Sequence, residues 1–181
     1  MKKLILITCL SMFILNNSCE SQVSSVGMTS WEGVKDMKWH IGTEAPIKTV
    51  AEFEDAWKSR DYDKMKSMCT DTTTFVSGDG VPESIDELIA NVKRQNSVRD
   101  SIGATLTWET KQVFSVDLKP GEGGEHVHSY IDAKYTEGEA TNRFRAIQRW
   151  FVSDGKIVQQ SSYWQDIVDE ENIVSYFFEK H

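Results

Sequence analysis

Apolar residues recur at helical spacing in three stretches of the first half of the chain. Thr49 and Glu52 have the spacing of a capping box, and Val50, Phe53 and Trp57 then share one helix face. Asp61 can cap a second, shorter helix, and Ser84 with Glu87 forms another capping box that opens a third. The other apolar positions that these helices would turn inward are Met65, Met68, Cys69, Ile85, Leu88, Ile89 and Val92.

The second half of the chain alternates in the manner of β-strands. A short β-branched strand over 72–77 precedes the third helix and ends in the loop 78–80. Four longer strands are predicted over 104–116, 126–135, 140–152 and 157–166, with turns at 137–138 and 154–155. Helices followed by a run of antiparallel strands predict an α+β domain, with three helices packed on a strongly curved antiparallel sheet.

The amino terminus changes this picture by adding an export signal. Lys2 and Lys3 precede an uncharged apolar stretch, Leu4–Leu15, which is typical of a signal peptide. Ser18-Cys19 then resembles a bacterial lipoprotein cleavage site, which implies a lipid on Cys19. The predicted segments are a signal peptide (1–18), a tether (19–45), the domain (46–168) and a capping segment (169–181). We expect a lipid-anchored location in the cell envelope, facing the periplasm or the exterior, with secretion as a soluble protein as the alternative.

Charge and cysteine content narrow the possible partners. Without residues 1–18 the chain has 18 Lys+Arg against 28 Asp+Glu, a net charge of −10, which argues against nucleic-acid binding. Cys69 is the one cysteine beyond Cys19, so no internal disulfide is expected, and the thiol reads as a small buried hydrophobe. His126 and His128 could supply two metal ligands, but a third is not evident. No metal or cofactor is predicted.

The order of the predicted elements carries a family resemblance. Helix, helix, strand, helix and four strands, with Asp154-Gly155 and then Tyr163-Trp164 shortly before Asp166, resembles the nuclear transport factor 2-like superfamily. That group includes the SnoaL-like and ketosteroid-isomerase-like proteins, and the resemblance covers about residues 46–168. It implies a cone-shaped domain with a pocket between sheet and helices, and often a homodimer.

Strand alternation and the resemblance disagree about which sheet face lines that pocket. Regular two-residue turns place Ile131 opposite Phe144, Trp150 opposite Gln159 and Ala146 opposite Tyr163, which separates an apolar face from a polar one. Pattern alone buries the apolar face. The resemblance implies that Trp164 lines the pocket, and we therefore expect the polar face inside. The apolar face, with Phe144, Trp150 and Tyr163, would then form a homodimer contact. The expected pocket comprises Trp57, Phe53, His128, Tyr130, Arg145, Ile147, Gln160, Ser162 and Trp164.

The chemistry of this expected pocket favours binding over catalysis. Arg145 beside aromatic rings suits a small, possibly anionic ligand. The resemblance places the isomerase's three catalytic groups at Phe53, Ser77 and Ile147, none of which can perform their roles. Non-catalytic ligand binding is one hypothesis. A SnoaL-like lyase, cyclase or hydrolase is a second, with His128, Asp132 or Asp79 as weak catalytic candidates, and a protein-interaction or structural dimer module is a third.

Overall fold

The computed structural model describes residues 24–167. The predicted signal peptide, Cys19 and the capping segment 169–181 lie outside the described residues. The helices are α2 (Glu44–Lys58), α3 (Tyr62–Ser67) and α4 (Ile85–Ile102). The strands are β1 (Ser25–Met28), β2 (Lys38–Ile41), β3 (Cys69–Val76), β4 (Pro82–Ser84), β5 (Thr105–Asp117), β6 (Gly124–Glu137), β7 (Ala140–Ser153) and β8 (Lys156–Asp166).

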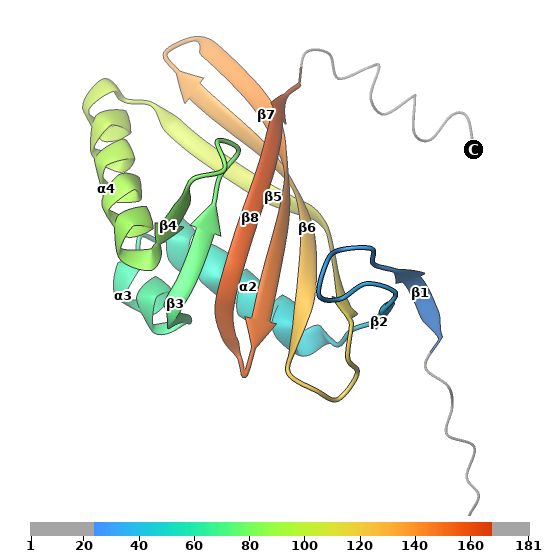
Figure 1. Ribbon diagram of the computed structural model, residues 1–181. Helices are drawn as coiled ribbons and strands as arrows, with labels where there is room; N and C mark the ends of the chain where they lie inside the picture. Colours follow the sequence, from blue (N-terminus) through green and yellow to red (C-terminus); the bar gives the residue numbers. More distant parts are fainter. Residues whose placement is uncertain (1–23, 168–181) are drawn as a thin grey trace, which may run out of the picture.

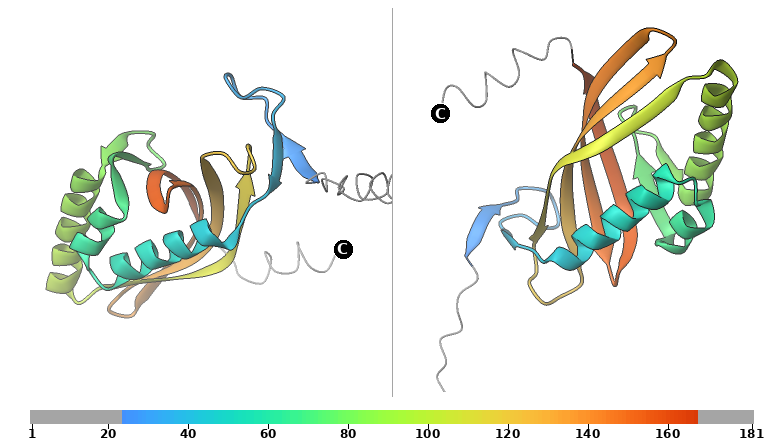
Figure 2. Two further views of the ribbon diagram at one scale, coloured as in Figure 1. Left: turned by 90° about the horizontal axis from the view of Figure 1, so that it is seen from below. Right: turned by 180° about the vertical axis from the view of Figure 1, so that it is seen from behind.

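All eight strands belong to one curved sheet in the order β1-β2-β5-β6-β7-β8-β3-β4. Neighbouring strands are antiparallel except β3 and β8, which run parallel. The sheet bends around α2, which crosses its concave side, while α3 and α4 close one flank (Figures 1 and 2). The predicted α+β architecture, with helices on a curved antiparallel sheet, is confirmed.

Two of the three predicted helix starts are confirmed. The Asp61 side chain accepts a hydrogen bond from the Lys64 backbone N–H and caps α3. Ser84 and Glu87 form a reciprocal capping box at α4. The predicted start at Thr49 is wrong, because α2 already begins at Glu44 and Thr49 donates its hydroxyl hydrogen bond to the Ala45 carbonyl one turn earlier. A threonine inside a helix can satisfy its hydroxyl in this way, so the capping-box spacing alone did not mark a boundary.

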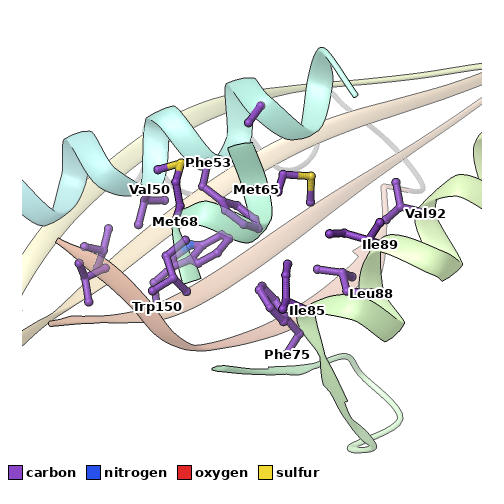
Figure 3. Close-up of a cluster of buried hydrophobic side chains, with 14 residues drawn as sticks. Val50, Phe53, Met65, Met68, Phe75, Ile85, Leu88, Ile89, Val92 and Trp150 are labelled. Carbon is purple, nitrogen blue, oxygen red and sulfur yellow. The ribbon is translucent and has the colours of Figure 1, made fainter. Parts of the chain in front are cut away.

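The core fills the space between the three helices and the concave sheet face (Figure 3). Phe53 from α2 is fully buried and packs edge-on against Trp150 of β7, with ring centroids 5.6 Å apart. Met65 of α3 and Ile157 of β8 are also fully buried. Cys69 packs at the margin of this cluster, and burial raises the pKa of its thiol to about 11, which makes it unreactive as a nucleophile.

The concave face is the apolar one, so the expectation of a polar interior is wrong. Ile131, Ala146 and Trp150 are buried there under the helices. The β6–β7 turn is formed by residues 138–139, which pairs Ile131 with Ala146 and shifts the predicted register without exchanging the faces. The helices present an apolar surface to only one side of the sheet, and that surface requires the apolar side chains of the strands.

A bulge in β8 changes the predicted faces of its second half. Val152 pairs with Ile157 as predicted, but Phe151 pairs with Gln159, so Val158 is an extra residue. Because one extra residue reverses the alternation, Trp150 lies opposite Gln160 and Ala146 opposite Trp164. Gln160, Ser162 and Trp164 therefore follow the concave face, and Tyr163 follows the convex face.

The segment before α2 is part of the sheet. β2 pairs with the end of β5, and β1 pairs with β2, so the sheet begins well before the predicted domain boundary at residue 46. The Thr43 hydroxyl donates to Glu125 at 2.7 Å, and the Trp39 ring meets His126 edge-on at 5.0 Å. No helix in the described part of the chain is long and apolar enough to cross a membrane.

Candidate functional site

A cavity of about 650 Å³ lies between the C-terminal halves of α2 and α4 and the concave faces of β5, β6 and β7. Apolar side chains make up most of its wall. The principal ones are Trp57, Leu106, Trp108, Ile131, Phe144 and Ala146. A half-open, mainly apolar cavity with few polar groups is the usual form of a small-molecule site.

Two tryptophans form one wall of this cavity. Trp57 of α2 and Trp108 of β5 meet edge-on with ring centroids 6.2 Å apart. The Lys58 ammonium lies 5.5 Å from the centroid of the Trp108 ring. Trp57 is a predicted pocket residue that does line the cavity, because it lies one turn beyond the buried Phe53 on the inner side of α2.

Glu54 supplies the buried acid of the cavity. It is only 6 % exposed, and its Oε2 accepts a 2.8 Å hydrogen bond from the Thr110 hydroxyl. Its Oε1 is buried without any hydrogen-bond partner among the described residues. Burial raises the pKa of this carboxyl, while the Thr110 hydrogen bond opposes the rise. A buried acceptor with no partner is rare in folded proteins, and Glu54 lines the cavity.

A short polar chain provides the other hydrogen-bonding group of the cavity. The Trp150 indole N–H donates to the Ser129 hydroxyl at 3.3 Å. That hydroxyl donates in turn to the Gln148 side-chain carbonyl, also at 3.3 Å. Gln148 lines the cavity, and the hydrogen bond from fully buried Ser129 fixes the orientation of its side chain.

Two of the charged residues at the cavity rim, Arg60 and Asp100, neutralise one another as an ion pair. Arg60 donates two hydrogen bonds to Asp100, at 2.7 and 2.8 Å, and both residues line the cavity. Arg99 donates to the Asn96 side chain at 2.6 Å. The buried carboxyl group of Glu54 and the ion pair of Arg60 with Asp100 favour a neutral ligand that can donate a hydrogen bond.

Several residues predicted to line the pocket lie on the convex face instead. Arg145 donates to Asp132 through Nε at 2.7 Å, and this pair holds the pKa of Asp132 below its usual range. His128 stacks on Phe114 with ring centroids 5.1 Å apart. Tyr130 of β6 pairs with Ile147 of β7. The prediction of an anion held inside by Arg145 is therefore wrong, because the helices cover the opposite face.

The remaining predicted pocket residues are on the concave side but outside the cavity lining. Phe53 is fully buried in the core, and Gln160 is buried beside Trp150. Ser162 pairs with Gln148. Trp164 is 62 % exposed and contacts Phe144 with ring centroids 6.3 Å apart.

None of the predicted catalytic candidates forms an acid/base pair in the described structure. Asp132 is engaged by Arg145, whereas His128 stacks on Phe114. Asp79 accepts a hydrogen bond from the Val81 backbone N–H at 3.1 Å and serves the turn after β3. Across residues 24–167, no group of three or more His, Cys, Asp or Glu side chains could hold a metal ion.

The isomerase-equivalent positions are not gathered in the cavity either. Phe53 belongs to the core, exposed Ser77 follows β3, and Ile147 faces outward from β7.

The three residues predicted to form the dimer contact do not share one surface, because each faces a different environment. Trp150 is 1 % exposed within the chain, Phe144 lines the cavity, and Tyr163 is 61 % exposed on the other side. A homodimer as such stays a prediction.

Sequence reasoning missed Glu54 and Trp108. Glu54 lies four residues after Val50 and three before Trp57, so it falls on the apolar face of α2. A charged residue on an apolar helix face was the signal that could have identified it.

Comparisons with known proteins give similarity of structure alone. No protein-family model and no curated protein matches the sequence. The beta subunit of the benzoate 1,2-dioxygenase from Burkholderia mallei has 12 % identity and a TM-score of 0.55, covering 69 % of this chain and 91 % of that chain. An LEH-like epoxide hydrolase of Mycobacterium tuberculosis has 14 % identity and a TM-score of 0.53, covering 68 % and 84 %.

A third solved structure carries the name of the fold. The NTF2-like protein of unknown function from Burkholderia pseudomallei has 14 % identity and a TM-score of 0.53, covering 68 % of this chain and 92 % of that one. At such identities a shared fold does not imply a shared activity. The chain has the nuclear transport factor 2-like fold.

Proposed function

We propose that this protein is an exported binding protein whose concave cavity takes a small, neutral and largely apolar molecule bearing one hydrogen-bond donor. The observation that carries the proposal is the buried Oε1 of Glu54, an acceptor without a described partner on a side chain that lines a mainly apolar cavity of about 650 Å³. A ligand O–H or N–H directed at Oε1 would satisfy it. Trp57 and Trp108 would contact the apolar body of the ligand.

Binding of 2-naphthol and 2-methoxynaphthalene, measured by calorimetry, tests this proposal. The two probes share an aromatic body, but only the first can donate a hydrogen bond to Glu54. We expect the wild type to bind 2-naphthol about tenfold more tightly than its methyl ether, as one buried hydrogen bond to a carboxyl group would give.

Matched variants assign the preference to Glu54. Glu54→Met should abolish the difference between the two probes, whereas Glu52→Met, at an exposed position on the same helix, should retain it. Equal affinities of the wild type for the two probes would contradict the proposal. So would a preference that survives in Glu54→Met.

A second candidate function is general acid/base catalysis by Glu54 on a bound substrate. The specific observation in its favour is that burial raises the pKa of Glu54 while Oε1 has no partner. A carboxyl group whose pKa is shifted toward neutrality is suited to proton transfer.

Ring opening of 5-nitrobenzisoxazole would detect such a base. The Glu54 carboxylate takes the proton from the ring C–H carbon, that electron pair forms the nitrile, the N–O bond breaks, and the oxygen leaves as a phenolate. We expect Glu54→Gln to lower the rate by roughly 100-fold if Glu54 is the base. Equal rates for wild type, Glu54→Gln and Glu52→Gln would contradict catalysis by Glu54, and binding would be the one function still proposed.

The location proposed for this domain rests on the sequence. Lys2, Lys3 and the apolar stretch after them support export, and Ser18-Cys19 supports a lipid anchor. Metabolic labelling with a fatty acid should mark the wild type and not Cys19→Ala. Equal labelling of both would remove the anchor from the proposal while leaving the cavity unaffected.

A further inference from the structure

A second pocket lies on the convex face, on the opposite side of the sheet from the cavity with Glu54. It has a volume of about 440 Å³ and is formed where the segment 26–31 passes over β5, β6 and β7. Its wall is mainly apolar and aromatic. The residues that matter for the argument are Trp31, Trp39, Phe114, His128 and Arg149.

Arg149 is the one permanently charged residue among the described residues that line this pocket. Its guanidinium carbon lies 4.5 Å from the centroid of the Trp31 ring. Its Nε is buried and has no hydrogen-bond partner among the described residues. No Asp or Glu belongs to the described residues that line the pocket. A desolvated N–H of a cation without an acceptor is a site that an anion would stabilise.

Two neighbouring histidines do not compete for an anion as cations. Burial, and then the nearby Arg149, lower the pKa of His128. The same causes lower the pKa of His126 to about 4. Both rings are therefore held neutral near pH 7, and the charge of the pocket is that of Arg149 alone.

The loop that covers Arg149 is held in place by its own hydrogen bonds. The Asp36 backbone N–H donates to the Thr29 carbonyl at 2.8 Å, and Thr29 N–H donates to the Met37 carbonyl at 3.0 Å. The Thr29 side chain is buried and accepts from the Trp31 N–H at 3.3 Å. Trp31 is thus positioned over the guanidinium by a closed turn, and the pocket is preformed.

We propose that this convex-face pocket binds a small organic carboxylate, with the carboxylate on Arg149 and an aromatic or apolar body between Trp31, Trp39 and Phe114. The two binding surfaces of the molecule then differ in charge. The concave cavity carries a buried acid and suits a neutral donor, whereas the convex pocket carries a half-buried cation and suits an anion.

Titration of the protein with 1-naphthoate and with its neutral methyl ester, which has no hydrogen-bond donor for Glu54, tests this site. We expect 1-naphthoate to bind about tenfold more tightly, the effect of one charge-assisted hydrogen bond in a partly exposed site. In NMR spectra the Arg149 Nε–H resonance should shift saturably with 1-naphthoate. An unshifted resonance at saturation would overturn the proposal whatever the variants show.

Four variants locate the binding. Arg149→Gln should remove the preference for the anion. Trp31→Ser, in the exposed loop, should lower the affinity for 1-naphthoate without affecting folding. Arg145→Gln is the matched control, because Arg145 lies on the same face of β7 but is engaged by Asp132. Trp57→Ala, in the concave cavity, should leave 1-naphthoate binding unchanged. Loss of the anion preference in Arg145→Gln or Trp57→Ala to the same extent as in Arg149→Gln would place the anion elsewhere.

Discussion

Glu54 is a buried side chain and Arg149 a half-buried one, and the fold leaves a buried polar atom of each without a hydrogen-bond partner. Each retains one atom without a partner, Oε1 in Glu54 and Nε in Arg149. They lie on opposite sides of one sheet: Glu54 belongs to α2 on the concave side, and Arg149 lies beneath the loop that holds Trp31 on the convex side. Unsatisfied buried groups destabilise a protein, so their presence in pockets is the residue-level feature that points to ligands.

The titration of Glu54 predicts how its replacement affects stability. Because its folded pKa is raised, the folded state holds the proton more tightly, and the free energy of unfolding falls as pH rises from the unfolded value through the folded one. Glu54→Gln removes this loss. The stability gain of Glu54→Gln over wild type should therefore be larger at about pH 8 than at about pH 4.5.

Urea denaturation of both proteins at the two pH values measures this difference. Glu52→Gln serves as the control, because Glu52 is exposed on the same helix. A gain that is independent of pH would mean that Glu54 titrates as an ordinary carboxyl group.

At the scale of elements, Thr49/Glu52 and Ser84/Glu87 share the spacing of a capping box, but of these two sites a helix begins only at the second. Ser84 and Glu87 form a real capping box, whereas Thr49 and Glu52 have the same spacing inside α2. The two sites make a matched pair. Ser84→Ala should lower the free energy of unfolding by about 1 kcal/mol, because it frees the N–H of Glu87 and breaks the box.

Thr49→Ala is the companion measurement. Thr49 is half-buried within α2, and alanine has the higher helix propensity, so the change should be neutral or slightly stabilising. Thermal unfolding of the two variants distinguishes them. A loss at Thr49 as large as at Ser84 would contradict the position of the α2 start.

Much of the fold could be predicted from the sequence because its elements are locally specified. Alternation identified the four long strands, and the turn at 154–155 gave the correct pairing of Val152 with Ile157. The bulge at Val158 could not be predicted, since it leaves no composition signal and acts through pairing. It reversed the faces of everything after it, including Trp164.

The candidate site was harder to predict for the same kind of reason. Trp57 could be placed in the cavity from helical spacing alone. Glu54 was passed over because a charged residue in a helix usually faces solvent, and its burial depends on the distant partner Thr110. Arg145 was expected inside the pocket because the resemblance implied a polar inner face. Burial of the apolar side chains decides the inner face instead, and it places Arg145 on the convex side.

At the scale of the whole molecule, His126 ties the amino-terminal strands to the main sheet. Its ring contacts Trp39 of β2 and Phe151 of β7, with centroids 5.0 and 4.8 Å apart. Arg149 and His128 are the charged or titratable groups that act on its pKa. Protonation of this half-buried ring would place a second positive charge beside Arg149 and weaken the attachment of β2.

Acid should therefore destabilise the molecule through His126. Because its pKa is lowered from 6.5 to about 4, the unfolded state binds more protons, and stability is lost as pH falls between these values. His126→Phe should reduce this loss by about 2 kcal/mol, a figure that allows for partial exposure of the ring. Unfolding free energies of both proteins at about pH 7 and about pH 4 check it. Identical pH dependence would contradict the role of His126.

The parallel pairing of β3 with β8 has a consequence for the order of folding. Ile157 donates its backbone N–H to Met68, and Gln159 to Ser161 pair with Thr74 to Val76, across more than half of the described chain. Helices α2, α3 and α4 cannot enclose their core until this last strand has arrived. Contacts of such long sequence separation slow folding to the range of about milliseconds to seconds. An emerging chain would therefore stay open until residues 157–161 have been synthesised, with Phe53 and Met65 still accessible to a chaperone.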